Sequence, residues 1–236
     1  MSGSILRIAF IVCCVSVMSA GGCKKDARDA AAPPPAGQSS GLSARLNAMP
    51  PPAQIDTLRG LVAADTSNAQ LRFFAGNAYY SYGSGLDETA PTRVAYLDSA
   101  IAQYDRAASI DSTMSKAWVN MGLAYQERHN TPEARKALQR AIEVNPNDVL
   151  AYCHLGYLSH VSGDLSEAMR QYNLALAIDP ASPQAHYNLG LAFAEAKIFD
   201  EALREWNLVV KNDPNGELGK TAAENVRIIQ QYNAKP

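Results

Sequence analysis

Three series of residues recur at a spacing of 34 positions in the second half of this chain. The members of the series are Gly122, Gly156 and Gly190; Ala134, Ala168 and Ala202; and Pro146, Pro180 and Pro214. Three independent series at one spacing predict an array of structural repeats. A chain of this kind stacks one supersecondary unit on the next, so each unit packs mainly against its neighbours.

The residue types within one period predict a helical hairpin. A glycine in the first helix and an alanine twelve positions later in the second allow two antiparallel helices to approach closely. The proline that follows cannot continue the second helix and ends the unit. Large side chains four positions before the glycines and four after the alanines fill the remaining space; they are Trp118, Tyr152 and His186, and Leu138, Tyr172 and Trp206.

This pattern resembles the tetratricopeptide repeat, which combines an aromatic residue, Leu-Gly, Tyr, Ala, a second aromatic residue, Ala and Pro at fixed offsets. Residues 115–148, 149–182 and 183–216 each match most of these positions, with departures at Ser159 and His186. The resemblance implies an all-α fold, a right-handed superhelical solenoid of antiparallel helix hairpins.

An altered unit precedes the three regular ones, in residues 69–114. It has 24 residues from Gly76 to Ala100 where 12 are standard, so about twelve are inserted. We expect "GSGLDETAPT" to form a longer loop and the second helix to be lengthened from Val94 onward.

Two further helices are expected at the ends of the array. Residues 48–68 predict a lone half-repeat helix with Leu58 and Leu61 facing inward. Residues 217–236 predict a capping helix with a polar outer face, which an array needs to end in water. Within the array, Thr131 of "TPEA" is expected to cap a helix, with Pro132 at the first helical position.

Residues 1–22 have the pattern of a secretory signal peptide. Arg7 precedes an uncharged apolar core that leads to small residues, and the core is too short for a transmembrane span. The segment "SAGGC" resembles the lipobox of bacterial lipoproteins, which implies acylation of Cys23 with fatty acids such as palmitate. The alternative is an ordinary signal cleavage site that ends near a cysteine. Residues 23–47, rich in Ala, Pro, Gly and Ser, predict a flexible tether.

The resemblance to lipoproteins also implies a location. A lipidated protein of this layout is expected in the bacterial cell envelope, held in a membrane by its acyl chains. Lys24, which follows the cysteine, implies the outer membrane under the enterobacterial sorting rule. We therefore expect the array to face the periplasm.

Charge and cysteine usage exclude several functions. Lys and Arg number 21 against 23 Asp and Glu, which gives no electrostatic argument for a nucleic-acid partner. Of the four cysteines, only Cys153 lies beyond the signal peptide and the lipobox, so no internal disulfide is predicted. No Walker loop, dinucleotide fingerprint, G-x-S-x-G or H-E-x-x-H motif occurs. We expect neither an enzyme nor a cofactor.

In the tetratricopeptide family the first helix of each hairpin lines a concave groove, so the resemblance implies partner-binding positions. These are Phe73, Asn77 and Tyr80; Val119, Leu123 and Gln126; Cys153, Tyr157 and His160; and Tyr187, Leu191 and Ala194. Family members that clamp a C-terminal carboxylate carry Lys and Arg at positions that here hold Phe73, Leu150 and His154. An apolar helix or extended segment of another protein is therefore the expected guest.

Cys153 and His160 raise the question of a metal or a nucleophile. Two candidate ligands on one face are too few for a zinc site. Side chains two turns apart start ~10 Å apart at the backbone, too far for a nucleophile and its base. A packing or small apolar groove role for Cys153 is the better interpretation.

Three functions are compatible with these observations. The leading hypothesis is a non-enzymatic, lipid-anchored scaffold or adaptor that binds another envelope protein through its groove. The second is a structural subunit of an oligomeric envelope or secretion assembly. The third is a ligand-binding or enzymatic role of Cys153 and His160.

Overall fold

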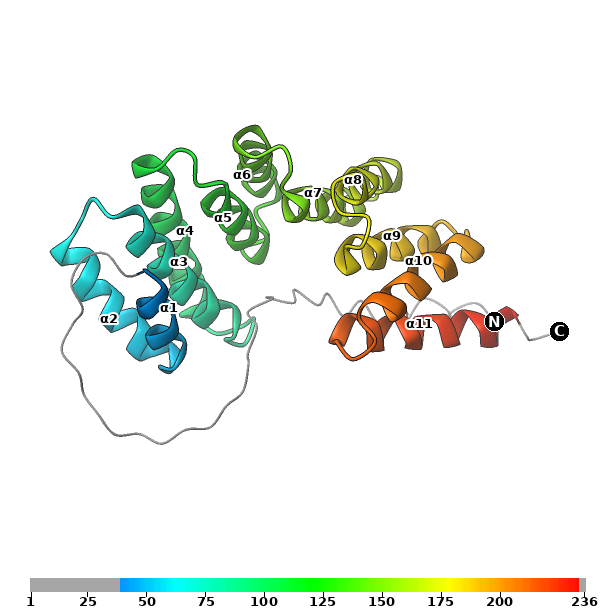
Figure 1. The fold of residues 1–236 in the computed structure, drawn as a ribbon, viewed down its shortest axis with the longest axis horizontal. Coiled ribbons are helices and arrows are strands. Elements are labelled where there is room, and N and C mark those ends of the chain that lie inside the picture. Colours follow the sequence, from blue (N-terminus) through cyan, green and yellow to red (C-terminus); the bar gives the residue numbers. More distant parts are fainter. Residues whose placement is uncertain (1–38, 234–236) are drawn as a thin grey trace. The chain divides into compact units, whose positions relative to one another are not determined.

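The computed structural model describes residues 39–233 (Figure 1). The predicted signal peptide, Cys23 and the first part of the tether lie outside the described residues. The chain divides into two units, Met1–Arg45 and Leu46–Pro236, and the second contains the repeats. No helix within residues 39–233 has the length and apolar character that a membrane span requires.

The end of the predicted tether is helical. Helix α1, Ser39–Asn47, lies within the stretch expected to be flexible. Leu42 and Leu46 are four positions apart and share one helical face, and Leu46 is buried. The prediction of a flexible tether, which rested on the segment "AAAPPPAG", therefore does not hold for residues 39–47. This segment contains good helix formers such as Leu, Ala and Arg.

Ten helices of the second unit form the array, and no strand occurs among the residues described. They are α2 Pro51–Ala64, α3 Ala69–Ser84, α4 Arg93–Ile110, α5 Ser115–Glu127, α6 Thr131–Val144, α7 Val149–Val161, α8 Leu165–Ile178, α9 Pro183–Glu195, α10 Phe199–Asn212 and α11 Glu217–Asn233. The prediction of an all-α solenoid of helix hairpins is confirmed.

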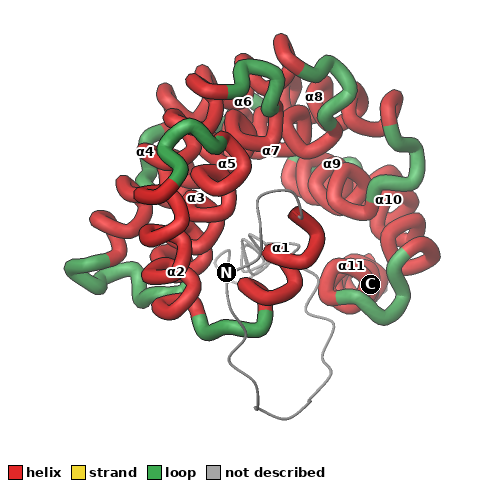
Figure 2. The backbone as a smooth tube through the Cα atoms, turned by 60° about the vertical axis from the view of Figure 1, so that its left-hand side comes forward, coloured by secondary structure: helices red, strands yellow, loops and turns green. Residues whose placement is uncertain are grey.

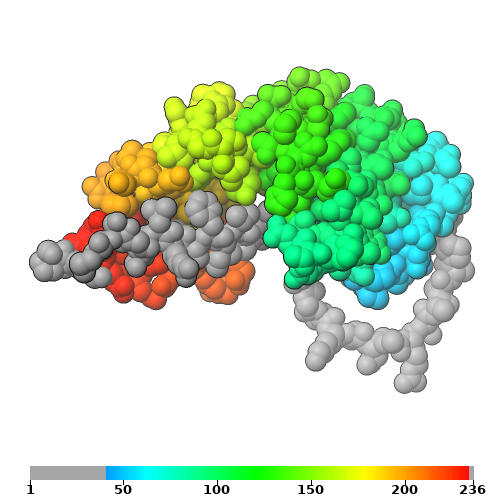
Figure 3. All heavy atoms as spheres, turned by 180° about the vertical axis from the view of Figure 1, so that it is seen from behind, coloured from blue at the N-terminus to red at the C-terminus, as the bar shows by residue number. Residues whose placement is uncertain are grey.

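The hairpins follow one another along a curved array within this unit. Helices α3, α5, α7 and α9 form its inner layer, and α4, α6, α8 and α10 form the outer layer (Figure 2). Successive inner helices contact one another, α3 with α5, α5 with α7 and α7 with α9. The space-filling view from behind shows the hairpins in sequence order (Figure 3). At the start of the array, Leu58 of α2 is buried as expected, whereas Leu61 is half-buried.

Close approach at the repeated glycines explains the first 34-residue series. A Cβ atom at Gly156 would lie 2.4 Å from Cε1 of Tyr172, and one at Gly190 would lie 2.5 Å from Nε1 of Trp206. Both aromatic side chains are fully buried, so neither can move aside into solvent. Each glycine therefore provides the space for the large side chain of its partner helix.

Gly156→Ala is expected to lower the free energy of unfolding by about 1–3 kcal/mol, because overpacking of the contact with Tyr172 outweighs the gain in helix propensity. Gly60→Ala is the matched control. Nothing lies within 4 Å of a Cβ atom at Gly60, which is in the interior of α2. This change is expected to stabilise the protein by about 0.5–1 kcal/mol through helix propensity. Urea unfolding of both variants measures the two effects, and a loss at both positions would contradict the account.

A further set of residues, in the turns after the inner helices, also recurs every 34 positions. Its members share a backbone conformation and not a residue type. His129, Gly163 and Lys197 all have positive φ, of 54°, 82° and 62°. Each follows an inner helix and ends it with backbone hydrogen bonds of the Schellman type, for example from the N–H of Asp164 to the carbonyl of Ser159 at 2.9 Å. His129 therefore lies in the turn between α5 and α6.

The residue that follows each left-handed residue is the N-cap of the next outer helix. The side chains of Asn130 and Asp164 accept hydrogen bonds from the N–H groups of Glu133 and Glu167. The prediction that Thr131 caps α6 was wrong by one position, because the left-handed residue is His129 and the capping position follows it. Ile198 has the equivalent place before α10 and makes no side-chain cap.

Ile198→Asp is expected to raise the free energy of unfolding by about 1 kcal/mol, because a carboxylate at this position accepts a bond from an unpaired helical N–H group. Ile198 is 45% exposed, so little apolar burial is lost. Thermal unfolding monitored by circular dichroism measures the change, with Asp164→Ala as the reciprocal variant. Equal melting temperatures for Ile198→Asp and the wild type would refute the capping argument.

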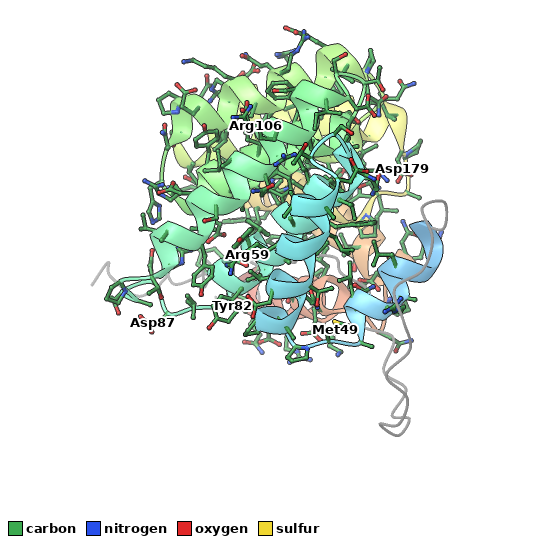
Figure 4. All side chains as sticks on the ribbon, turned by 90° about the vertical axis from the view of Figure 1, so that its left-hand side faces the viewer. Met49, Arg59, Tyr82, Asp87, Arg106 and Asp179 are labelled. Atoms are coloured by element: carbon green, nitrogen blue, oxygen red, sulfur yellow. The ribbon has the colours of Figure 1, made fainter. Side chains whose placement is uncertain are left out.

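The insertion lengthens the first full hairpin at three places. Compared with α5 and α6, α3 gains three residues, α4 gains four and the connecting loop gains five. The expected loop "GSGLDETAPT" is shorter than predicted at its start, because Gly83 and Ser84 continue α3. Asp87 lies in the loop, beyond the end of α3 that carries Tyr82 (Figure 4).

Ion pairs join the inserted region to the end of α5. Arg93 pairs with Glu127, and both side chains are largely buried, at 10% and 16% exposure. Asp98 pairs with Arg128, and Glu88 pairs with His129 at the surface. The inserted residues therefore attach the first hairpin to the second at the level of the turn.

Candidate protein-binding surface

The groove positions predicted from the sequence fall on the four inner helices, α3, α5, α7 and α9. They differ in exposure. Six are buried, namely Tyr80, Val119, Cys153, His160, Tyr187 and Ala194. Six are half-buried, namely Phe73, Asn77, Leu123, Gln126, Tyr157 and Leu191. A guest molecule can therefore touch the second group most readily.

Four amide side chains on these helices make hydrogen bonds, whereas the buried Oε1 of Gln126 has no hydrogen-bond partner among the residues described. The carbonyl Oδ1 of Asn77 accepts from the hydroxyl of Tyr104 and from Nδ2 of Asn120, both at 2.9 Å. On α9, Nε2 of Gln184 donates to Oδ1 of Asn188 at 3.1 Å. The first bond network crosses from one repeat to the next and fixes the orientation of both asparagines.

Cys153 is a packing residue. Its side chain is 1% exposed and lies in a cluster with Ala175 and Ala185, from α8 and α9. Burial raises the pKa of its thiol to about 12, and the negative charges of Asp148 and Asp179 act in the same direction. A thiol in this environment is a poor nucleophile, because the thiolate is the reactive form.

We expect Cys153 to react with iodoacetamide at pH 8 about a thousandfold more slowly than an unperturbed thiol, since the thiolate fraction falls with the raised pKa. Burial slows the reaction further. The test follows alkylation by mass spectrometry in buffer and in 6 M guanidinium, on protein in which the other three cysteines are Ala. Comparable rates in the two solvents would show that Cys153 is accessible.

His160 and His186 are buried and make hydrogen bonds to neighbouring helices and turns. His160 Nε2 lies 2.6 Å from the carboxylate of Glu195, which joins α7 to α9. His186 is buried at the aromatic position, with Nδ1 at 2.6 Å from Glu205 and Nε2 at 3.0 Å from the carbonyl of Pro180. Within residues 39–233 no three His, Cys, Asp or Glu side chains are grouped in a way that would hold a metal ion.

Two exposed apolar residues on α7 were not among the predicted positions. Leu150 and Val161 are each 51% exposed. In the family pattern, position 150 is one at which carboxylate-clamping members carry a basic residue, and position 161 has no assigned role. Comparison of equivalent positions in the three regular repeats would have found them, because Lys116 and Glu127 stand at these places in α5.

Family comparison covers the regular part of the array. Models of the tetratricopeptide repeat match residues 115–148, 137–170, 160–196 and 179–217, which overlap without a gap. Residues 115–217 are tetratricopeptide repeats. The tetratricopeptide resemblance inferred from the sequence is thereby confirmed for these residues.

Solved tetratricopeptide structures share the fold of the array. MamA is 22% identical, with 75% of this chain and 96% of MamA covered at a TM-score of 0.60. TTC0263, a thermophilic TPR protein of Thermus thermophilus, is 14% identical, with 79% and 96% covered at 0.62. YrrB, described as a TPR protein with an unusual peptide-binding site, is 22% identical, with 78% and 88% covered at 0.54. A search among curated protein sequences gave no match.

Proposed function

We propose that this tetratricopeptide protein is a non-enzymatic adaptor that binds a segment of another protein on the inner surface of α3, α5, α7 and α9. The composition of that surface supports the proposal most strongly. Phe73, Leu123, Tyr157 and Leu191 are half-buried apolar or aromatic side chains. They lie among the amides of the same helices. Protein interfaces combine large apolar contact area with a few hydrogen-bonding groups in this way.

The similarity to YrrB supports the same function. YrrB has a peptide-binding site in the same fold. In this chain, the thiol of Cys153 is buried and the imidazole of His160 is hydrogen-bonded to Glu195, so neither is placed to act as a nucleophile on the inner surface. We therefore favour binding over catalysis for this surface.

A quantitative co-purification tests the adaptor function. The full chain is expressed in its bacterial envelope, crosslinked and purified, and bound proteins are measured by mass spectrometry. Leu123→Gln with Leu191→Gln is expected to reduce recovery of a specific partner about tenfold or more. Leu174→Gln with Leu208→Gln, on the outer helices α8 and α10, is the matched control. Unfolding curves of both double variants verify that they fold.

The same experiment separates the adaptor from a structural subunit. Loss of partner only in the inner-surface variant supports an adaptor. Equal loss in both variants, with stable oligomers of the wild-type chain, would instead favour an assembly subunit. Recovery that neither variant changes would refute binding at the inner surface.

The membrane anchor is a second part of the proposal and rests on the sequence. "SAGGC" supports acylation of Cys23, and the membrane affinity of several acyl chains supports firm attachment. Cys23→Ala is expected to move the protein from the membrane fraction to the soluble fraction. Cys153→Ala is the control and is expected to leave the protein in the membrane fraction. Retention of the Cys23→Ala chain in the membrane would rule out the anchor.

A further inference from the structure

One face of α7 differs from the faces of its neighbours, and it bears on which partner the proposed adaptor binds. Leu150 and Val161 are the most exposed large apolar side chains among the residues described, at 51% each. They are eleven positions apart, which is three helical turns and ~16 Å along the axis. Eleven residues return a side chain to nearly the same face. His154 and Tyr157 lie between them on that face.

The other faces of α7 are used by the core. Ala151, Leu155 and Leu158 pack with α5 and α6. Cys153 packs with α8 and α9, and the backbone at Gly156 lies against the ring of Tyr172. Positions 150, 154, 157 and 161 therefore form one stripe on the inner surface. We call it the α7 stripe.

The α7 stripe carries no carboxylate, lysine or arginine. Burial lowers the pKa of His154 to about 4, so this side chain is neutral near pH 7. The stripe thus has an exposed apolar residue at each end, Leu150 and Val161, with Tyr157 as the aromatic member between them.

The equivalent positions on both sides are more polar. In α5 they hold Lys116, Asn120, Leu123 and Glu127, and in α9 they hold Gln184, Asn188, Leu191 and Glu195. Each neighbour thus has one leucine, one asparagine and a glutamate at the helix end. The α7 stripe is an apolar strip bordered by polar groups, which is the arrangement of a recognition surface with an apolar centre.

The charges at the two ends of this surface are opposite. Lys116 is exposed at the start of α5. The side chain of Glu195 is 48% exposed at the end of α9, where its carboxylate also contacts His160, whereas Glu127 is largely buried against Arg93. A guest that lies along the stripe meets a positive charge at one end and a negative charge at the other.

A helical guest fits this surface better than an extended one. An extended segment leaves its backbone N–H and C=O groups to be paired by the host, whereas a helix pairs them internally. Two of the nearby amides each already make a hydrogen bond within the protein, since Asn120 donates to Asn77 and Asn188 accepts from Gln184. The stripe spacing of i, i+4, i+7 and i+11 is also that of helix-on-helix packing.

We propose that the partner segment is an amphipathic α-helix of about three turns that lies along α7. Its apolar face contacts Leu150, Tyr157 and Val161. A lysine or arginine of the partner lies near Glu195, and an acidic residue lies near Lys116. This inference rests on the proposed adaptor function and specifies the class of partner.

A peptide selection tests the proposal. The purified full chain in detergent is presented to a phage library of random 16-residue peptides, and enriched peptides are synthesised for binding measurements. We expect apolar residues at i, i+3 or i+4, and i+7, with a basic residue towards one end. Val161→Glu is expected to weaken binding about tenfold or more. Leu174→Glu makes the same change from an exposed aliphatic residue on α8 and should leave the affinity unchanged.

The outcomes distinguish this inference from the adaptor function itself. Enriched peptides with proline or alternating apolar residues would overturn the helical partner. Peptides whose binding is weakened by Leu123→Gln with Leu191→Gln but not by Val161→Glu would also overturn it. Either result is compatible with the adaptor function. The absence of enriched peptides, or binding that no inner-surface substitution changes, would count against both. Circular dichroism of each variant verifies that it folds.

Discussion

Trp206→Ala is expected to lower the free energy of unfolding by about 3–5 kcal/mol, the cost of removing a large aromatic side chain from a packed core. Trp206 is fully buried and is the largest of the completely buried side chains. It packs against Gly190 of α9, and its cluster includes Val209, Ala222 and Ile229. Trp206 is therefore part of the cluster that joins the last full hairpin to the terminal helix α11.

Trp206→Phe is the matched control for this prediction. Phenylalanine keeps an aromatic ring between the helices but removes the hydrogen bond from Nε1 to the carbonyl of Tyr187 at 3.2 Å. We expect a loss of about 1–2 kcal/mol, near the value of one buried hydrogen bond with some lost volume. Urea titration followed by far-ultraviolet circular dichroism gives both values. A loss below about 1 kcal/mol for Trp206→Ala would show that α10 does not depend on this contact.

Glu127→Ala is the second change with a large expected effect, about 3 kcal/mol of destabilisation. It leaves the guanidinium of Arg93 buried without its carboxylate, and an uncompensated buried charge is costly. One bond remains, from Nη1 of Arg93 to the backbone carbonyl of residue 127 at 2.9 Å. We therefore expect a destabilisation at the lower end of the range that is typical when one partner of a buried ion pair is removed.

Asp98→Ala is the control for the buried pair. Asp98 pairs with Arg128, but its side chain is 54% exposed, so its removal is expected to cost less than about 1 kcal/mol. Both variants are compared by chemical denaturation. If Asp98→Ala were as destabilising as Glu127→Ala, burial would not explain the strength of the attachment between the inserted hairpin and α5.

Residue identity alone predicts the repeats of this protein because its packing contacts are local. Gly156 and Tyr172 meet within one hairpin, and the same pair of positions recurs every 34 residues as Gly122 with Leu138 and Gly190 with Trp206. The repeat period and the positions of the glycine, the large residue and the proline therefore predict both the approximate helix boundaries and the contacts between helices. Family models and solved structures agree with that inference for residues 115–217.

The capping position and the inserted loop were predicted less well. The left-handed residue of the turn is Gly163 in one repeat but His129 and Lys197 in the others, so composition does not identify it. Gly83 lies in α3 although glycine is common in loops, because α3 and α4 approach closely there and a Cβ atom would lie 3.0 Å from Cβ of Tyr96. The capping position is decided by the backbone conformation of the turn, and the place of Gly83 by the contact between α3 and α4.

The sequence predicted which positions lie on the inner helices, but it did not predict how exposed each side chain is. Helical spacing places Cys153 and Tyr157 on the same helix, but only packing with Ala175 and Ala185 shows that the cysteine is buried. Conversely, the exposure of Leu150 and Val161 could have been predicted by aligning the repeats, because the polar residues Lys116 and Glu127 stand at the equivalent positions of α5.

Photocrosslinking in cells that express the full chain tests the central claim, that the inner surface binds another protein, most directly. A photoreactive amino acid replaces Leu191 on inner helix α9, and a control replaces Leu208 on outer helix α10, which is 38% exposed. We expect a discrete adduct with one other protein from position 191 and none from position 208. Equal adducts from both positions, or adducts only between copies of this chain, would contradict the adaptor function.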